Sequence, residues 1–223
     1  MTLEPIARFH APFGENFGIP RQSGLVDSLC GEIRFEARYR QAEAFRGLEG
    51  FDYIWILWGF DRNRRDAGNW HATVRPPRLG GNRSEGVFAT RSPYRPNPIG
   101  LSSVRLERID LRTCTLYVRG ADLADGTPIY DIKPYLAYTD AHPDAAGGWT
   151  DECEWTELEV LFPEELRRLV PPEDVPILRQ LLAQDPRPHY QDDPEKEYGM
   201  RFGGYDVKFR VDAGTLTVIS IEK

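Results

Sequence analysis

Residues 51–60 read FDYIWILWGF, a run in which nearly every side chain is aromatic or aliphatic. The run is much shorter than the roughly 20 apolar residues that a membrane-spanning helix needs. It is also rich in the aromatic and β-branched residues that favour strands over helices. The run therefore predicts a strand that is buried on both faces.

Further short segments with strand composition lie on either side of this run. Residues 104–107, VRLE, alternate apolar and polar side chains as a half-buried strand does. Strands are predicted over residues 3–9, 31–37, 87–90, 104–109 and 115–118. One short helix is predicted over 41–46, and Gly47 is expected to end it.

The pattern changes after Gly147-Gly148, which we take as a boundary between domains. A strand is predicted at 155–162, helices at 163–169 and 173–183, and a hairpin over 205–221 with its turn at 212–214. No strand, glycine-rich turn and helix follow one another as in dinucleotide-binding folds. We therefore expect a mainly β protein, with a β-barrel or closed sheet in residues 1–145 and a small α+β domain in residues 146–223.

The three cysteines, Cys30, Cys114 and Cys153, are scattered and form no C-x-x-C pair, which argues against a zinc site or a disulfide framework. We expect them to be small buried apolar residues in a reducing compartment. No segment is long and apolar enough to span a membrane, and residues 1–5 lack the pattern of a signal peptide. These features predict a soluble, cytoplasmic protein without a membrane partner.

The net charge of −7 argues at first against a nucleic-acid partner. Residues 60–100, however, contain eight arginines against three acids, a local charge of +5. Phosphate binding depends on the local field rather than on the total charge. The segment is compatible with RNA binding, and a solvated basic surface remains the alternative.

Four blocks carry an unusual density of chemically active residues. They are GIPRQSGLV at 18–26, TVRPPRLGG at 73–81, GVFATRSPYRPNPIGLS at 86–102 and DLADGTPIYDIKPY at 122–135. In the third block, three prolines and two glycines predict a stiff loop that presents Arg91, Tyr94, Arg95 and Asn97. A structural loop seldom needs two arginines and an amide on such a frame, although an ordinary surface loop remains possible.

The fourth block places Asp122, Asp125 and Asp131 near Lys133, with a turn at Asp125-Gly126. Three carboxylates of this kind can bind a metal, hold a sulfonium or an amine, orient arginines, or simply cap a turn. The spacing carries no specific magnesium signature, so no metal site is predicted. The four histidines likewise show no triad or metal spacing.

Together with LAQDPRPHY at 182–190, these blocks resemble the tRNA N6-threonylcarbamoyladenosine methyltransferases, also known as YaeB/TsaA-like proteins, over most of the chain. The resemblance implies a single-sheet β-barrel that binds S-adenosylmethionine, a small C-terminal domain and a homodimer. It further implies methylation of N6 of threonylcarbamoyladenosine at position 37, chiefly in threonine tRNAs. The implied partner is the tRNA anticodon loop, not DNA.

The resemblance also assigns the cofactor site. The residues that it implies are Pro20, Arg21, Gln22, Asp61, Arg62, Arg91, Leu101, Asp122, Leu123, Ala124 and Asp125.

The proposed chemistry suggests the remaining roles. The exocyclic nitrogen of adenine is a weak nucleophile, so catalysis needs in-line positioning and an acceptor for its N–H. We hypothesise that Asn97, on the frame of Pro96 and Pro98, is this acceptor, with a backbone carbonyl as the alternative. An arginine fork suits the threonyl carboxylate, and aromatic side chains stack on RNA bases. The candidate catalytic residues are Asn97, Tyr94 and Arg95, and the candidate substrate residues are Arg75, Arg78, Trp70 and Lys133.

Three other functions remain open at this point. The protein could methylate a small molecule or another RNA, which the acidic total charge favours. It could be a non-enzymatic RNA-binding barrel. The aspartates of the fourth block could also serve a metal-dependent hydrolase.

Overall fold

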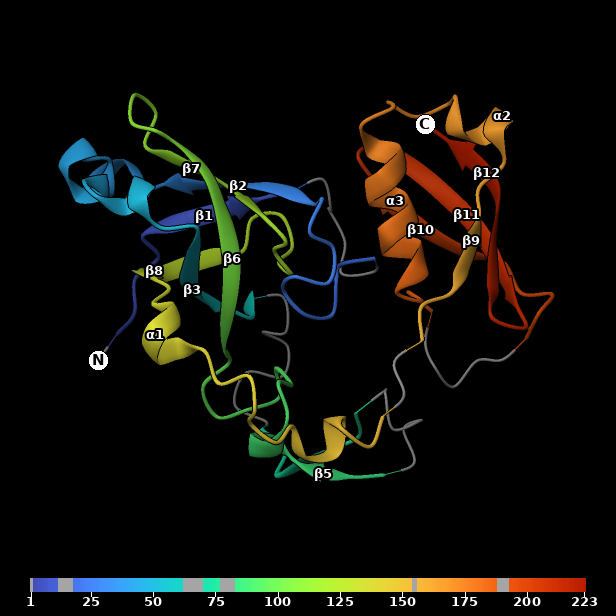
Figure 1. The fold of residues 1–223 in the computed structure, drawn as a ribbon, viewed down its shortest axis with the longest axis horizontal. Helices are drawn as coiled ribbons and strands as arrows, with labels where there is room; N and C mark the ends of the chain where they lie inside the picture. The colour runs from blue at the N-terminus through green and yellow to red at the C-terminus, as the bar shows by residue number, and fades with distance from the viewer. Residues whose placement is uncertain (1, 12–17, 62–69, 77–82, 154–155, 188–192) are drawn as a thin grey trace.

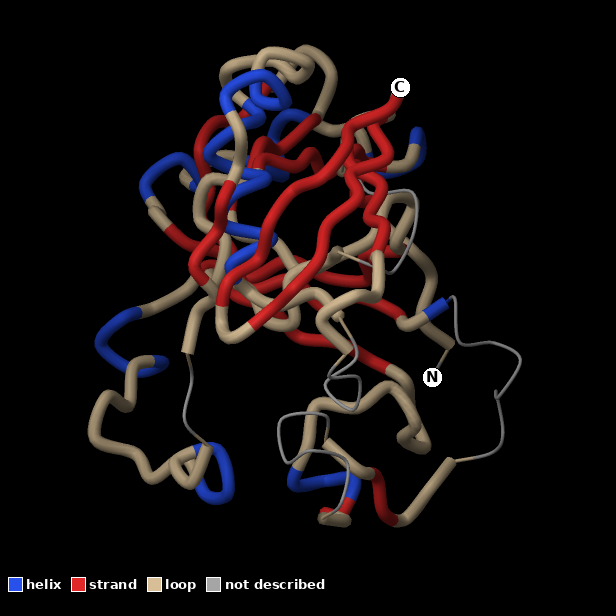
Figure 2. The backbone as a smooth tube through the Cα atoms, turned by 90° about the vertical axis from the view of Figure 1, so that its right-hand side faces the viewer, coloured by secondary structure: helices blue, strands red, loops and turns tan. Residues whose placement is uncertain are grey.

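The computed structural model describes residues 2–11, 18–61, 70–76, 83–153, 156–187 and 193–223. Two β-rich bodies lie side by side, and the chain passes between them at one end (Figure 1). Figure 2 shows most of the strands gathered in one half of the molecule, with loops, short helices and a short strand ribbon in the other. Among the described residues, no helix is long and apolar enough to cross a membrane.

The first body is a closed antiparallel barrel of six strands, in the order β1-β2-β7-β6-β3-β8. The strands are β1 (Ala7–His10), β2 (Cys30–Phe35), β3 (Tyr53–Gly59), β6 (Ile99–Asp110), β7 (Thr115–Arg119) and β8 (Pro128–Pro134). Fully buried side chains such as Phe9, Ile33 and Leu116 fill its interior. The expected mainly β fold with a barrel is confirmed.

Strand β3 corrects the prediction for residues 51–60. Ile54 and Ile56 are fully buried inside the barrel, whereas Tyr53 is 45% exposed and Trp55 and Leu57 are half-buried on the outside. The strand is real, but the prediction that both faces are buried is wrong. Closing a sheet into a barrel leaves each strand one interior face, so the outer aromatic residues are only partly covered.

One further element prediction is wrong in type. The strand predicted over 87–90 is the 3-10 helix η6 (Val87–Ala89), whereas the short helix predicted over 41–46 is present as the 3-10 helix η2 (Ala42–Phe45). In η6, Thr90 N–H donates to the Val87 carbonyl at 3.2 Å, and this bond closes a turn instead of extending a strand. The first strand begins only at Ala7, after Pro5, which has no N–H to give to a ladder. The remaining elements of this half are η1 (Ala37–Tyr39), η3 (Leu48–Gly50), β4 (Thr73–Val74), β5 (Glu85–Gly86), α1 (Ala137–Asp140) and η7 (Gly148–Thr150).

The second body is a four-stranded sheet, ordered β10-β11-β12-β9, with the helix α3 beside it (Figure 1). Its elements are β9 (Glu159–Leu161), α2 (Glu164–Arg167), α3 (Asp174–Ala183), β10 (Tyr198–Phe202), β11 (Tyr205–Asp212) and β12 (Thr215–Glu222). The predicted hairpin is confirmed, and its turn places Ala213 at φ 44° and Gly214 at φ 83°. Two left-handed residues in succession make the tight turn that matches the twist of paired strands.

The loop that precedes β2 joins the two bodies. Val26 and Leu29 are buried in the hydrophobic core of the second body, not in that of the barrel. Ser28 Oγ donates to Gln180 Oε1 of α3 at 2.5 Å. The division at 145/146 therefore stays a prediction, and residues from the first part complete the core of the second.

The cysteines are all free, and Cys114 is buried. Cys30 is exposed at the start of β2 and Cys153 is only partly buried, so the prediction that every cysteine is buried is wrong for these two residues.

Candidate functional site

A chain of hydrogen bonds crosses one end of the barrel. Trp58 Nε1 donates to Ser102 Oγ at 3.0 Å, and Ser102 Oγ donates to Asp122 Oδ1 at 2.6 Å. Trp58 is 8% exposed and Ser102 is 2% exposed. These residues come from β3, β6 and the turn that follows β7, so the chain of bonds ties three segments together where the strands end.

The sequence explains why the indole of Trp58 fits here. Trp58 is paired with Gly100 on β6, and a Cβ atom at Gly100 would overlap the indole ring. Glycine leaves the ring room to lie against the strand and to reach Ser102 two residues further on. The close approach of the indole ring explains why a glycine is needed at position 100, near the end of the third sequence block.

The Asp122 carboxyl group has an unusual environment. Burial raises its pKa above the ordinary value. The hydrogen bond from Ser102, the backbone N–H groups of Asp122 and Ser23, and the charge of Arg91 act in the opposite direction. The arrangement is a desolvated carboxylate with several donors, which suits the recognition of a cationic or hydroxyl-bearing ligand.

Two loops close around this carboxylate. Arg91 Nη1 donates to Gln22 Oε1 at 2.5 Å, which links the third sequence block to the first. Gly24 N–H donates to the Gly120 carbonyl at 2.8 Å, which fastens the first block beside Asp122. The structure thus brings together three predicted cofactor residues that are far apart in the sequence.

The other predicted cofactor residues differ in burial and in the side of the sheet on which they lie. Leu123, Ala124 and Pro20 are buried, and Asp61 is half-buried just beyond β3. Leu101 is 54% exposed and, as the neighbour of Ser102 on the same strand, faces the opposite side of the sheet. Arg62 lies outside the described residues.

Arg21 reaches into the second body. Its Nη2 donates to the backbone carbonyls of Asp185 at 2.9 Å and Arg187 at 3.3 Å. Asp185 and Arg187 are themselves joined by an ion pair of 2.9 Å. The neighbouring residues Arg21 and Gln22 therefore have different partners: Gln22 contacts the loop of Arg91, and Arg21 contacts the C-terminal body.

The remaining aspartates of the fourth block have separate partners. Asp125 Oδ1 lies 3.2 Å from His10 Nδ1 and accepts from Ala11 N–H at 3.3 Å, and Asp131 pairs with Lys133 at 3.0 Å. Within the part of the chain that the structure describes, no three His, Cys, Asp or Glu side chains form a group that could hold a metal. These two aspartates thus act as turn and ion-pair partners.

The predicted catalytic residues lie on the loop that precedes β6. Arg95 Nη2 donates to the carbonyls of Val87 at 3.0 Å and Thr90 at 2.8 Å, so this guanidinium holds the loop in shape. Tyr94 is 39% exposed and Asn97 is exposed. Their catalytic roles stay predictions, and the contacts of Arg95 favour a supporting role for that residue.

The predicted substrate residues are mostly at the surface. Trp70 is 50% exposed, Arg75 is exposed directly after β4, and the Lys133 side chain is 65% exposed on the outer wall of the barrel. Arg78 lies outside the described residues. Sequence reasoning missed Trp58 and Ser102, although a serine inside an apolar strand pattern is a signal that a buried polar partner exists.

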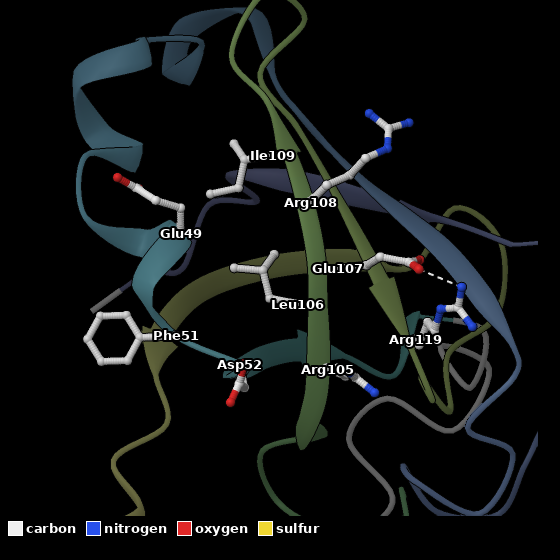
Figure 3. Close-up of a pocket in the computed structure, with 9 residues that line it drawn as sticks. All are labelled: Glu49, Phe51, Asp52, Arg105, Leu106, Glu107, Arg108, Ile109 and Arg119. Atoms are coloured by element: carbon white, nitrogen blue, oxygen red, sulfur yellow. Dashed lines mark hydrogen bonds and ion pairs between the residues drawn. The ribbon is translucent and has the colours of Figure 1, made fainter.

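An open groove of about 480 Å³ lies elsewhere, on the outer wall of the barrel around β6 (Figure 3). Its lining residues are Glu49, Phe51, Asp52, Arg105, Leu106, Glu107, Arg108, Ile109 and Arg119. Arg119 pairs with Glu107 at 2.5 Å, and three acids balance the three arginines. None of the predicted site residues lines this groove.

The chain matches two family models. Residues 8–141 match the tRNA-methyltransferase O N-terminal domain, and residues 156–223 match the TrmO C-terminal domain. It is 41% identical to the tRNA (adenine(37)-N6)-methyltransferase of Escherichia coli strain K12, over 99% of this chain and 97% of that protein. It is also 41% identical to a Pseudomonas aeruginosa protein described as a putative S-adenosylmethionine-dependent methyltransferase, over 92% of this chain and 90% of that protein.

Solved structures agree with these matches. The crystal structure of TrmO from Pseudomonas aeruginosa superimposes with a TM-score of 0.81, at 32% sequence identity, and the match covers 100% of this chain and 99% of that chain. The similarity therefore extends over both bodies of the molecule.

Proposed function

The chain belongs to the tRNA-methyltransferase O family, and we propose that it transfers a methyl group from S-adenosylmethionine to N6 of the adenine at position 37 of tRNA. The observation that carries this proposal is the match to the Escherichia coli enzyme over nearly the whole length of both proteins. The gathering of Gln22, Arg91 and Asp122 at one end of the barrel supports it.

The donor set at this end of the barrel fits the cofactor. S-adenosylmethionine, when bound, supplies an electrophilic methyl group on a sulfonium, and it also carries an ammonium and ribose hydroxyls. The Asp122 carboxylate can accept hydrogen bonds from the ammonium or a hydroxyl, and Ser102 keeps that carboxylate oriented. Arg91, whose charge acts on Asp122, and Gln22, which is bonded to Arg91, contribute further donors and acceptors. Pro20, which is buried, and Leu101, which is exposed on the other face of β6 from Ser102, remain cofactor residues only as part of the proposal.

The acceptor that we propose is adenine 37 bearing the threonylcarbamoyl group. Its N6 must lie in line with the methyl group, and its N–H needs an acceptor as charge develops. The amide oxygen of Asn97 takes this role in our proposal, since Asn97 is exposed on the same loop as Arg91. Arg75, which is exposed at the end of the ribbon of β4 and β5, is the candidate for the threonyl carboxylate.

We further propose that the RNA contact is the anticodon loop, that the protein acts as a homodimer, and that it works in the cytoplasm. The basic segment at residues 60–100, with its local charge of +5, supports an RNA contact. The homodimer rests on the family resemblance, and the cytoplasmic location rests on the scattered cysteines, which fit a reducing compartment.

The proposal is tested by incubating the protein with methyl-labelled cofactor and a tRNA transcript modified at position 37, then identifying the labelled nucleoside by mass spectrometry. Label in N6-methylated adenosine derivatives supports the reaction. A transcript with guanine at position 37 should take up no label. Cofactor binding without methyl transfer to any RNA would instead favour a small-molecule acceptor, and absence of cofactor binding would favour a non-enzymatic RNA-binding barrel.

A further inference from the structure

Three exposed aromatic side chains lie on adjacent segments of the chain outside the barrel. Phe88 is 78% exposed, Trp70 is 50% exposed and Tyr94 is 39% exposed. We propose that these three residues form one platform on which unpaired bases of the substrate RNA loop stack, and that Phe88 is its most important member. The identity of that RNA rests on the proposed function.

Backbone hydrogen bonds bring the three segments together. His71 N–H donates to the Tyr94 carbonyl at 3.2 Å, and Val87 N–H donates to the Ala72 carbonyl at 2.9 Å. The segment that begins at Trp70 is therefore bracketed by the Tyr94 segment on one side and the Phe88 segment on the other. The His71 ring also meets the Tyr94 ring edge-on, at 5.6 Å between centroids.

The segment bearing Phe88 is held from behind. Val87 is only 1% exposed, so the 3-10 turn buries one side chain and directs its neighbour Phe88 outward. Trp149 Nε1, from the connection between the two bodies, donates to the Ala89 carbonyl at 2.8 Å. Arg83 adds ion pairs to Glu85 at 2.6 Å and to Glu152 at 2.5 Å. A supported turn can hold an exposed phenyl ring in place for stacking.

The surrounding charge favours RNA as the occupant. The three aromatic residues belong to the stretch 60–100, whose net charge in the sequence is +5, and Arg75 and Arg91 of that stretch are exposed. Exposed aromatic rings combined with arginines are the usual surface for single-stranded nucleic acid, since the rings stack on bases and the arginines meet phosphates.

The platform also lies at a suitable distance from the cofactor loops. Arg91, which bonds to Gln22, is three residues from both Phe88 and Tyr94. Three residues span at most about 11 Å even when fully extended, so a base on the platform lies within reach of the nucleotide at the cofactor end of the barrel. The platform would then hold neighbours of the reacting adenine, not the adenine itself.

Binding of a fluorescently labelled anticodon stem-loop by Phe88→Ala tests the inference. One base–aromatic stack contributes enough to raise Kd by about fivefold to a hundredfold when it is lost. Phe88→Trp should restore tight binding, and the calorimetric Kd for S-adenosylmethionine should not change. The matched control is Tyr138→Ala on α1, which removes an aromatic ring that is 88% exposed on another element.

Wild-type RNA affinity in Phe88→Ala would overturn the platform. A difference in molar mass between Phe88→Ala and the wild type, measured by size-exclusion chromatography with light scattering, would also overturn it. The surface would then join two copies of the chain instead of binding RNA. The measurement is independent of methyl transfer. If the wild type methylates no tRNA but still binds RNA in a way that depends on Phe88, the platform is supported and the proposed function is contradicted.

Discussion

Ser102 Oγ donates a hydrogen bond of 2.6 Å to Asp122 Oδ1, and this bond joins a buried position of β6 to the turn after β7. Ser102 in turn accepts from the Trp58 indole, so its hydroxyl proton is directed towards the carboxylate. The carboxylate at the candidate cofactor site is therefore oriented by the interior of the barrel, and the first three predictions depend on this bond.

Ser102→Ala should weaken cofactor binding at neutral pH by about tenfold, because the carboxylate loses a donor to its charged form. The same loss should raise the pKa of Asp122 further, so the remaining binding should require a higher pH than in the wild type. Calorimetric titration across a pH series measures both effects. Ser103→Ala, on the opposite face of the same strand, is the control and should behave as wild type. Equal effects of the two substitutions would contradict a specific role for the Ser102 bond.

Asp122→Asn should change how stability depends on pH. Burial raises the pKa of Asp122 in the folded chain above its value of about 3.9 in the unfolded chain. The folded state then holds this proton more tightly, so the wild type loses stability as the pH rises from the unfolded pKa through the raised one. The variant lacks that loss and should gain stability relative to wild type as the pH rises through this range. Urea unfolding of both proteins measures this difference. A constant difference at every pH would contradict the raised pKa.

Gly100→Ala should destabilise the fold by about 1–3 kcal/mol, because the new methyl group overlaps the Trp58 indole and forces the strand or the ring to move. It should also weaken cofactor binding, since Trp58 supports Ser102. The control is Gly86→Ala, where a Cβ atom meets nothing within 4 Å and φ is −59°. Chemical unfolding monitored by tryptophan fluorescence compares the two variants. Similar stabilities of the two would contradict the close approach of Gly100 to the indole.

Arg91→Ala and Gln22→Ala should each weaken S-adenosylmethionine binding, and their effects should not add, because the two side chains form one hydrogen bond across the cofactor loops. Losses of about tenfold for each are expected from removal of a hydrogen bond that involves a charged group. A double-mutant cycle in calorimetric Kd measures the coupling. The control is Arg38→Ala, whose ion pair with Glu4 is at the barrel surface. Strict additivity would show that the bond has no role in binding.

The alternation of apolar and polar side chains, together with strand-favouring composition, predicted most of the strands and the C-terminal hairpin. The prediction was wrong for residues 87–90, which have side chains typical of strands. The carbonyls of Val87 and Thr90 accept hydrogen bonds from the guanidinium of Arg95 instead of from a neighbouring strand. The outer aromatic residues of β3 were placed incorrectly for a related reason. Hydrophobicity alone does not distinguish the interior of a barrel from a partly covered outer wall.

The candidate site was predictable from its sequence blocks but not from periodicity. The contact between Gln22 and Arg91 joins residues 69 positions apart, and no local pattern indicates which loops meet. Trp58 was assigned only to a hydrophobic strand, because an indole N–H that needs a partner looks the same in sequence as a packing residue. The contact of Arg21 with the C-terminal body was likewise invisible without the fold.

Methylation of threonylcarbamoyladenosine by this protein is tested by incubating the purified protein with methyl-labelled S-adenosylmethionine and two preparations of bacterial tRNA. One preparation comes from cells that make threonylcarbamoyladenosine, and the other from cells that cannot. We expect label in the first tRNA only, in a nucleoside that carries the methyl group on N6. Equal labelling of both would contradict the requirement for the prior modification, and label in neither would contradict the proposed methyltransferase activity on this tRNA.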